Sequence, residues 1–364
     1  MPQKKKGGIK IMKPINFTKH CIDSGKNETC AIADVDGDGI LDIVGGTHWY
    51  KGPEWVKYPM REMPFISGYI DNFADLPLDV NGDGRVDIIS GSWFRQQIAW
   101  YENPGEPGAP WREHIIDHPG NVEALCLVDI DGDGIPDILP NAFGIPVAWY
   151  KTHIGSEPYW KRIDIGDEGR THGIGYGDIN GDGRIDIITP SGWYEAPPNP
   201  VEQKWKWHPE FNLKSTGIPI LTYDVNNDGL ADLIWGGGHD YGLFWAEQCL
   251  KPDGSREWIQ HEIDMSWSQS HALVLADLDN DGISELITGK RYGAHGEGDP
   301  GGKDPTCLYW YKLDRDSQTW TRYTLDYGTG VGGGMQICVA DINGNGKLDI
   351  VAPGKGGLYL FEQQ

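Results

Sequence analysis

The chain has 364 residues, a formal net charge of −23, and 51 glycines and 24 prolines. With 31 Lys and Arg against 54 Asp and Glu and no basic stripe, the composition argues against a nucleic-acid-binding protein. No stretch reaches the ~20 apolar residues that a membrane-spanning helix needs, so we expect no membrane span.

The N-terminal segment is unlike the rest of the chain. Residues 1–13 carry the basic residues of a secretory signal without the apolar stretch that should follow. We expect residues 1–16 to form a flexible extension and residues 17–364 to form a single domain. Either the protein is cytosolic or a signal peptide has been removed, and we predict a periplasmic or extracellular location. Six cysteines without motif spacing favour free thiols over disulfides.

An acidic nine-residue loop recurs seven times along the chain. The first copy runs from Asp34 to Asp42, with carboxylates at positions 1, 3, 5 and 9 and glycine at positions 4 and 6. The other copies span residues 79–87, 129–137, 178–186, 224–232, 277–285 and 341–349. Their starts are 45 to 64 residues apart, which suits one four-stranded propeller blade per repeat. The sequence therefore predicts an all-β, seven-bladed β-propeller with four-stranded antiparallel blades.

The repeats also predict how the third and fourth strands of each blade pack. Aromatic pairs such as Trp49-Tyr50 and Trp149-Tyr150 recur at one place per blade, so we expect them to pack between blades. The last repeat stops after its third strand, while Phe17–Asp23 resembles the fourth strands of the other repeats. We therefore predict that the N-terminal strand completes the last blade and removes an open sheet edge.

The loops are expected to bind cations through oxygen ligands. Carboxylates or amides at positions 1, 3, 5 and 9, with a backbone carbonyl at position 7, supply the oxygens that Ca²⁺ prefers. Asp and Glu at these positions are as numerous as the whole charge excess. The predicted ligands are Asp34, Asp36, Asp38, Ile40 and Asp42; Asp79, Asn81, Asp83, Arg85 and Asp87; Asp129, Asp131, Asp133, Ile135 and Asp137; Asp178, Asn180, Asp182, Arg184 and Asp186; Asp224, Asn226, Asp228, Leu230 and Asp232; Asp277, Asp279, Asp281, Ile283 and Glu285; and Asp341, Asn343, Asn345, Lys347 and Asp349. We expect loops one and three to hold calcium best and loop seven to hold it worst.

The loops, each followed by apolar residues such as Ile43-Val44 and Ile88-Ile89, resemble the FG-GAP or VCBS repeats of calcium-binding β-propellers. This resemblance implies several calcium ions on one face, as in α-integrin propellers. The segments Thr171–Asp178 and Thr189–Glu195, with His48-Trp49-Tyr50, are similar to the propeller domain of aldos-2-ulose dehydratases. Polysaccharide lyases also use metal-binding propellers of this general kind.

The face opposite the loops is predicted to carry the site. Six residues before each loop, the first strands should begin beside the central channel, in a ring of Glu28, Phe73, Glu123, His172, Ile218, His271 and Met335. The turns between second and third strands should add His48, His239, Arg291 and Tyr292 on the same face, and residues 293–304 lengthen repeat six into a possible flap. The alternative is a solvated rim that happens to be polar.

These side chains suit elimination from a sugar that carries an acidic or keto group. His172 or His271 would be the base, Arg291 would stabilise the developing negative charge, and Tyr292 or the other histidine would be the acid. The same ring could instead hold a transition metal such as Zn²⁺ on His172, His271 and Glu123. The sequence does not choose between proton transfer and metal binding.

Two classes of function therefore stay open. One is a carbohydrate-active lyase or dehydratase with a small sugar or oligosaccharide substrate. The other is a non-catalytic propeller module that binds a glycan or a protein. No nucleophile motif, phosphate loop or dinucleotide fingerprint is present in the sequence.

Overall fold

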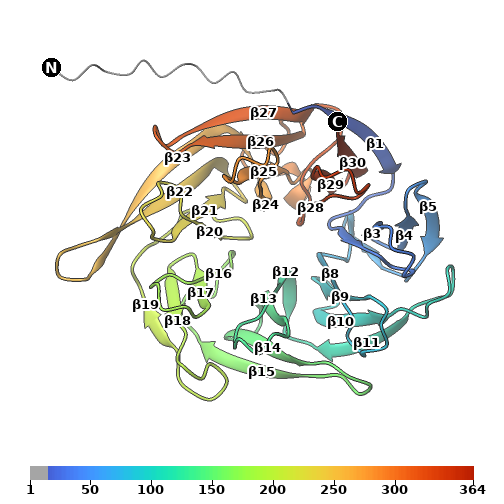
Figure 1. Ribbon diagram of the computed structural model, residues 1–364, viewed down its shortest axis with the longest axis horizontal. Helices are drawn as coiled ribbons and strands as arrows, with labels where there is room; N and C mark the ends of the chain where they lie inside the picture. Colours follow the sequence, from blue (N-terminus) through green and yellow to red (C-terminus); the bar gives the residue numbers. More distant parts are fainter. Residues whose placement is uncertain (1–14) are drawn as a thin grey trace.

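The computed structural model describes residues 15–364, and these residues form a ring of seven four-stranded sheets (Figure 1). This confirms the predicted seven-bladed propeller. The expected extension, residues 1–16, lies outside the described residues except for Ile15 and Asn16. Among residues 15–364, no helical segment has the length and apolar character needed to cross a bilayer.

Within each blade the strands follow one another antiparallel from the channel to the rim. Blades one to three contain β2 (Ala31–Ala33), β3 (Asp42–Gly45), β4 (His48–Lys51) and β5 (Val56–Pro59); β8 (Ala74–Leu78), β9 (Asp87–Ser92), β10 (Gln97–Glu102) and β11 (Arg112–Asp117); and β12 (Asn121–Val128), β13 (Asp137–Phe143), β14 (Val147–His153) and β15 (Tyr159–Gly166).

Blades four to six contain β16 (Gly175–Gly177), β17 (Asp186–Thr189), β18 (Gly192–Glu195) and β19 (Lys206–His208); β20 (Leu221–Tyr223), β21 (Asp232–Gly236), β22 (Tyr241–Leu250) and β23 (Arg256–Ser268); and β24 (Ser270–Ala276), β25 (Glu285–Lys290), β26 (Cys307–Asp314) and β27 (Thr319–Tyr327).

Blade seven is built from both ends of the chain. It contains β28 (Cys338–Ala340), β29 (Asp349–Gly354), β30 (Gly357–Gln363) and, as its outermost strand, β1 (Phe17–Asp23). In Figure 1 the blue β1 lies beside the red β30, and their register runs from Phe17 opposite Gln363 to Asp23 opposite Leu358. The predicted closure of the ring by the N-terminal strand is therefore confirmed.

The aromatic pairs lie in the third strands and are buried. Trp49, Trp149 and Trp193 are at most 2% exposed, and the tyrosines that follow them reach the preceding blade. Tyr150 donates a hydrogen bond to Asp117 at the end of β11, with 2.7 Å between the oxygens. Tyr50 donates in the same way to Asp23 at the end of β1. Apolar burial and these bonds hold neighbouring blades together.

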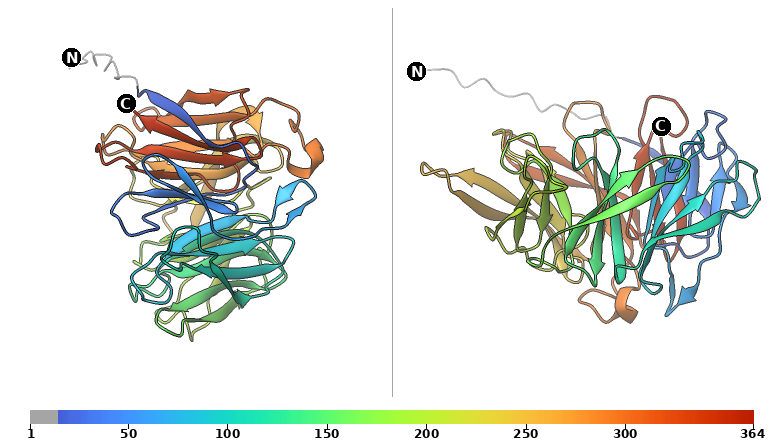
Figure 2. Two further views of the ribbon diagram at one scale, coloured as in Figure 1. Left: turned by 90° about the vertical axis from the view of Figure 1, so that its right-hand side faces the viewer. Right: turned by 90° about the horizontal axis from the view of Figure 1, so that it is seen from below.

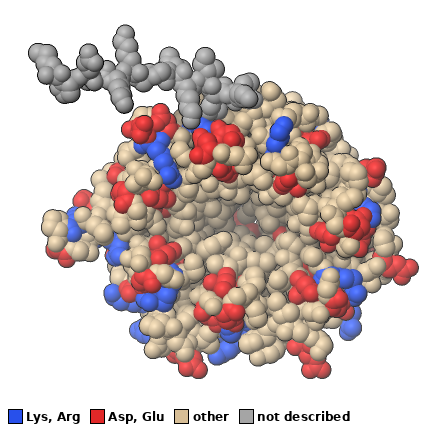
Figure 3. Space-filling view, in the orientation of Figure 1, with Lys and Arg blue, Asp and Glu red and all other residues tan. Residues whose placement is uncertain are grey.

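Two short elements stand outside the blades. The hairpin of β6 (Phe65–Ile66) and β7 (Tyr69–Ile70) precedes blade two, and the 3₁₀ segment η1 (Ala294–Glu297) lies in the insertion of blade six. Both project from the same face of the ring, at the bottom of the right-hand view in Figure 2. The acidic loops lie on the opposite face, where patches of Asp and Glu surround a hollowed centre (Figure 3).

Candidate functional site

A cavity of about 580 Å³ opens on the face from which η1 and the β6–β7 hairpin project. The cavity is lined by Ser67, Tyr69, Phe73, Trp93, Phe94, Glu123, Phe143, His172, His239, Arg291, His295 and Gly296. Phe73, Glu123, His172, His239 and Arg291, among others, were predicted from the sequence as ring or turn residues of this face. Counting back from the loops thus brings the ring residues Phe73, Glu123 and His172 to this cavity.

Three histidines from blades four, five and six meet at the polar end of the cavity. The ring centroids are 4.5 Å apart for His172 and His239, 5.2 Å for His172 and His271, and 5.0 Å for His239 and His271. One nitrogen of each ring lies within 4.8 Å of the others. His271 is completely buried, and neither of its nitrogens has a hydrogen-bond partner among residues 15–364. Burial and the nearby Arg291 lower the pKa of His271 well below its usual value, so this imidazole is neutral.

Glu123 lies between two cationic partners. Its carboxylate is 3.0 Å from Arg291 Nη1 and 3.2 Å from His172 Nε2. Burial opposes ionisation, but His172 and Arg291 outweigh it and lower the pKa of Glu123 to about 2. In turn, although burial opposes the charged imidazole, Glu123 raises the pKa of His172, whose Nδ1–H donates to the carbonyl of Thr216. Glu123 therefore favours the charged form of the His172 imidazole.

Arg291 continues this charged network towards blades seven and one. Its Nε is 3.4 Å from Glu28 Oε2, and Lys355 Nζ is 3.9 Å from Glu28 Oε1. Burial raises the pKa of Glu28, and burial also lowers the pKa of Lys355 to about 8. Lys355 Nζ lies 3.4 Å from the ring centroid of Tyr69, which places a cation against the aromatic wall of the cavity.

The insertion of blade six contributes a second histidine pair. Asp299 Oδ2 is 3.1 Å from His239 Nδ1 and 2.9 Å from His295 Nδ1, and the two imidazole rings stack at 4.6 Å. Burial and His172 lower the pKa of His239, so that its neutral form is favoured. Asp299 and His295 were not among the residues predicted for the site. The only signal for them was the unusual length of residues 293–304.

Three of the residues predicted to be catalytic do not line the cavity. His271 lies behind His172 and His239 with no exposed surface. His48 is in β4, where its Nδ1 is 2.7 Å from Thr47 Oγ1. Tyr292 is 38% exposed. These residues share the face with the cavity but are not part of its lining.

The rest of the cavity wall is largely aromatic. Tyr69 stacks on Phe73 at 6.0 Å, and Trp93 meets Phe143 edge to face at 5.5 Å. Phe143 is 38% exposed, so part of this wall faces solvent. Aromatic faces beside a small number of polar groups are typical of sites that orient a small organic ligand.

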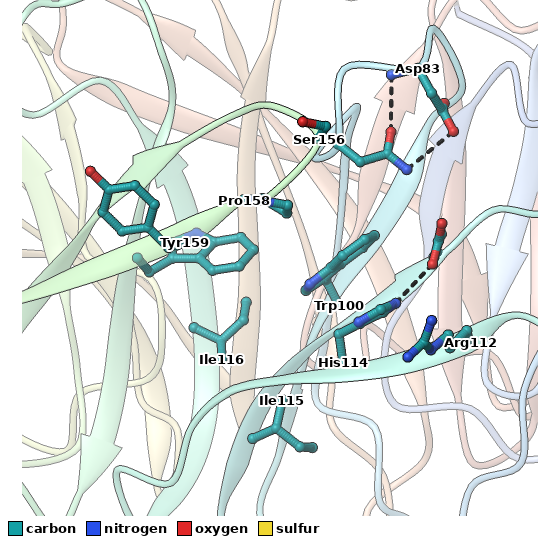
Figure 4. A pocket seen from close by; sticks show the side chains of 12 residues that line it. Asp83, Trp100, Arg112, His114, Ile115, Ile116, Ser156, Pro158 and Tyr159 are labelled. Carbon is teal, nitrogen blue, oxygen red and sulfur yellow. Dashed lines mark hydrogen bonds and ion pairs between the residues drawn. The ribbon is translucent and has the colours of Figure 1, made fainter.

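A second hollow, of about 700 Å³, lies between the outer strands of blades two and three (Figure 4). His114 stacks on Trp100 at 4.2 Å and its Nε2 is 2.8 Å from Glu102. The same stacking of an outer-strand histidine on the third-strand tryptophan recurs in blades four and five. The histidine in this hollow is therefore part of the repeating blade structure.

Three of the acidic loops each bring three carboxylates together. In loops one, three and six, carboxylate oxygens from positions 1, 3 and 9 lie within 4.8 Å of one another. The Oδ1 atoms at position 3, in Asp36, Asp131 and Asp279, are buried without a hydrogen-bond partner among the described residues. Clustered carboxylates with unpaired oxygens are the donor set that Ca²⁺ requires, so these three loops fit calcium.

A family model for the FG-GAP-like repeat matches residues 79–139 and 224–288. The chain contains FG-GAP-like repeats. The two matched segments cover loops two, three, five and six. A sequence comparison with curated proteins gives no match.

Comparison with solved structures gives propeller relatives of low sequence identity. A crystal structure of BBS1N in complex with ARL6DN is 10% identical, with a TM-score of 0.56 and 95% of each chain covered. A crystal structure of the rhamnogalacturonan lyase YesW is 14% identical, with a TM-score of 0.48, and covers 95% of this chain and 72% of the other. The first likeness supports the fold and does not assign an activity.

Proposed function

We propose that the protein is a carbohydrate-active lyase or dehydratase that performs β-elimination on a keto-sugar, a uronic acid or a related glycan in the cavity of about 580 Å³. The observation that carries this proposal is a pair of neighbouring histidines. The environment of one favours the protonated ring, and the environment of the other favours the neutral ring. Glu123 raises the pKa of His172 and so favours its protonated form, whereas burial and His172 lower the pKa of His239 and favour its neutral form. Environments that separate the pKa values of two neighbouring groups are typical of an acid and a base.

His239 has the arrangement of a general base. Its Nδ1–H donates to Asp299, which fixes the tautomer and leaves the lone pair on Nε2. His172 has the arrangement of the acid, because its ring lines the cavity and the carboxylate of Glu123, 3.2 Å from Nε2, favours the protonated imidazole. The two rings are 4.5 Å apart between centroids, close enough to serve one substrate.

The elimination follows from these positions. His239 takes the proton α to the carbonyl or carboxylate, and the electron pair of that C–H bond becomes the new double bond. The C–O bond at the β carbon breaks, and His172 gives its proton to the departing oxygen. Arg291, which lines the cavity, supplies positive potential where the enolate charge develops.

The same imidazoles offer an alternative arrangement, a transition-metal site. His172, His239 and His271 would hold an ion such as Zn²⁺ once His172 had lost its proton, because only a neutral imidazole nitrogen can be a ligand. Such an ion would supply Lewis acidity towards the substrate carbonyl. Glu123, expected from the sequence as a ligand, is instead paired with Arg291 and His172.

A non-catalytic glycan-binding module is the second candidate, and the aromatic wall favours it. Tyr69, Trp93 and Phe143 offer ring faces on which a sugar could stack without any chemistry. Under this function the histidines would contribute only hydrogen bonds to the ligand.

An assay with a panel of uronic-acid and keto-sugar substrates tests the proposal. We expect a new ultraviolet absorbance from a conjugated double bond with at least one substrate, and its loss in His239→Ala. Calorimetric binding of the same sugars should be measured in parallel, together with metal analysis of the purified protein. Binding without any product, unaffected by His239→Ala, would contradict the lyase proposal and support the binding module.

A further inference from the structure

The insertion of blade six, residues 293–304, forms part of the cavity wall and carries two ionisable groups of the site. His295 and Gly296 line the cavity, and Asp299 contacts His239 from this segment. The segment connects β25 to β26 and consists of η1 followed by turns. The position of Asp299 therefore depends on the contacts that hold an irregular segment in place.

The backbone of the insertion adopts a conformation that needs support from its surroundings. His295 and Glu297 are non-glycine residues with positive φ angles, 46° and 66°, and Gly296 between them has a φ of 61°. The left-handed region is unfavourable for a residue with a side chain, and such residues persist where surrounding contacts hold them. Contacts from outside the segment should therefore fix its course.

At its N-terminal end the insertion is held by Lys355, in the turn between β29 and β30. Lys355 Nζ donates to the carbonyl of Gly293 at 2.6 Å, and only 8% of the Lys355 side chain is exposed. A second contact runs from the amide of His295 to the hydroxyl of Tyr69, at 2.9 Å. The first turn of the insertion is thus attached to blade seven and to the β6–β7 hairpin.

At its C-terminal end the insertion is held by Lys290, the last residue of β25. Lys290 Nζ donates to the carbonyl of Gly301 at 2.7 Å and to Ser268 Oγ at 2.9 Å. Tyr241 donates to Asp304 Oδ2 at 2.6 Å. A Cβ at Gly301 would collide with Ser268 Oγ and Tyr241 Oη, so this end of the segment packs directly on blade five.

Both lysines are buried, and their bonds to the insertion are the shortest that they make. Lys290 is 1% exposed, and its hydrogen-bond partners among the described residues are the neutral oxygens of Ser268 and Gly301. Burial lowers the pKa of Lys290, and it lowers the pKa of Lys355 to about 8. Burying an ammonium group is unfavourable unless bonds offset the loss of water. For both lysines, the shortest of these bonds is to a carbonyl of the insertion.

We propose that Lys290 and Lys355 are positioning residues for His239. They hold the two ends of the insertion by its backbone carbonyls, and this keeps Asp299 against His239 Nδ1. With Asp299 in place, the neutral imidazole keeps its proton on Nδ1 and its lone pair on Nε2. The consequence for catalysis rests on the elimination proposed above, whereas the effect on the His239 tautomer does not.

Nitrogen NMR of the histidine rings in the full chain tests the inference without any substrate. In the natural protein we expect the His239 ring to carry its proton on Nδ1. Lys290→Met and Lys355→Met remove the ammonium groups and keep the apolar stems, and each should shift His239 to a mixture of the Nδ1–H and Nε2–H tautomers. Lys303→Met is the matched control, because Lys303 belongs to the same insertion and its side chain is exposed.

Turnover of a sugar substrate gives the second readout. Each of the two lysine variants should lower kcat about tenfold or more, because a displaced base reacts poorly. KM should change little, since the aromatic wall of the cavity is retained. If a lysine variant does not fold, Tyr241→Phe removes the bond to Asp304 and keeps the ring, and it should shift the His239 tautomer in the same direction.

The outcomes separate this inference from the proposed function. An unchanged His239 tautomer in the folded variants would overturn the positioning role, even if kcat fell. The same result beside normal turnover in the natural protein would leave the elimination standing. A shifted tautomer in a protein that forms no product from any sugar would support the positioning role and contradict the elimination.

Discussion

The imidazole of His172 and the carboxylate of Glu123 meet across the boundary between blades four and three, with 3.2 Å between Nε2 and Oε2. The contact lowers the pKa of Glu123 against the effect of burial and raises the pKa of His172. The contribution of this contact to the free energy of unfolding is present above the ordinary pKa of Glu. It is lost as the pH falls towards about 2, the lowered pKa of Glu123. On the alkaline side, it is lost as pH rises through the raised pKa of His172.

Replacing Glu123 by Gln should therefore lower the pKa of His172. The amide keeps the shape of the carboxyl group but removes the negative charge that favours the imidazolium. Histidine NMR titration of the two proteins checks this, and any activity that depends on protonated His172 should be lost at a lower pH in the variant. Glu102→Gln is the control, because Glu102 pairs with His114 in the outer strands. An unchanged His172 titration in Glu123→Gln would contradict the assignment.

His172→Ala and His239→Ala should each reduce turnover of the true substrate by a factor on the order of 10² or more, as loss of a general acid or base commonly does. Fold and calcium content should be unchanged, as measured by circular dichroism and calorimetric titration. The exposed His118 provides the control variant His118→Ala. Wild-type turnover in His172→Ala would refute its assignment, and equal insensitivity at Arg291 and His271 would favour the binding module.

Removal of calcium should lower the melting temperature. A ligand that binds only the folded state stabilises it by about 2.7 kcal/mol per site when its concentration is 100 times Kd. Differential scanning calorimetry with and without excess chelator measures the effect. An identical melt after metal analysis has shown the calcium to be gone would exclude a stabilising role for calcium.

Deleting residues 1–23 should destabilise the propeller, because this removes β1 and leaves β30 as an open edge. Phe17 and Ile22 also pack against the cores of the closing blades. Loss of two such side chains should lower the melting temperature by roughly 5–10 °C. A variant that starts at Met12 is the control, since it retains the whole of β1. Equal melting temperatures for the full chain and the chain that starts at Ser24 would show that closure contributes nothing.

The fold was predictable because the motifs that specify it are short segments of sequence that recur in every blade. The spacing of Asp34, Asp79 and the later loop starts fixes the blade length, and the fourth-strand pattern of Phe17–Asp23 identifies the closing strand. Counting back from each loop placed Glu123 and His172 at the cavity for the same reason. In a regular strand, the number of residues between the loop and the opposite end fixes which residue lies at the opposite face.

The contacts of the irregular segments were not predictable in this way. Asp299 reaches His239 through an insertion whose course depends on hydrogen bonds such as that from the His295 amide to Tyr69, at 2.9 Å. The depth of His271, which is on the ring but fully buried, depends on how neighbouring blades close around it. Sequence spacing gives the position of a residue along a strand and does not give its distance from solvent.

The construction of blade seven also determines how the molecule can be attached to something else. Phe17 and Gln363 are direct neighbours across one strand pair, and the amide of Gln363 bonds to Asp349 in loop seven. Both ends of the described chain are therefore at the loop face, away from the cavity (Figure 2). Immobilisation on a surface through either end would leave the histidine cavity turned towards the solution.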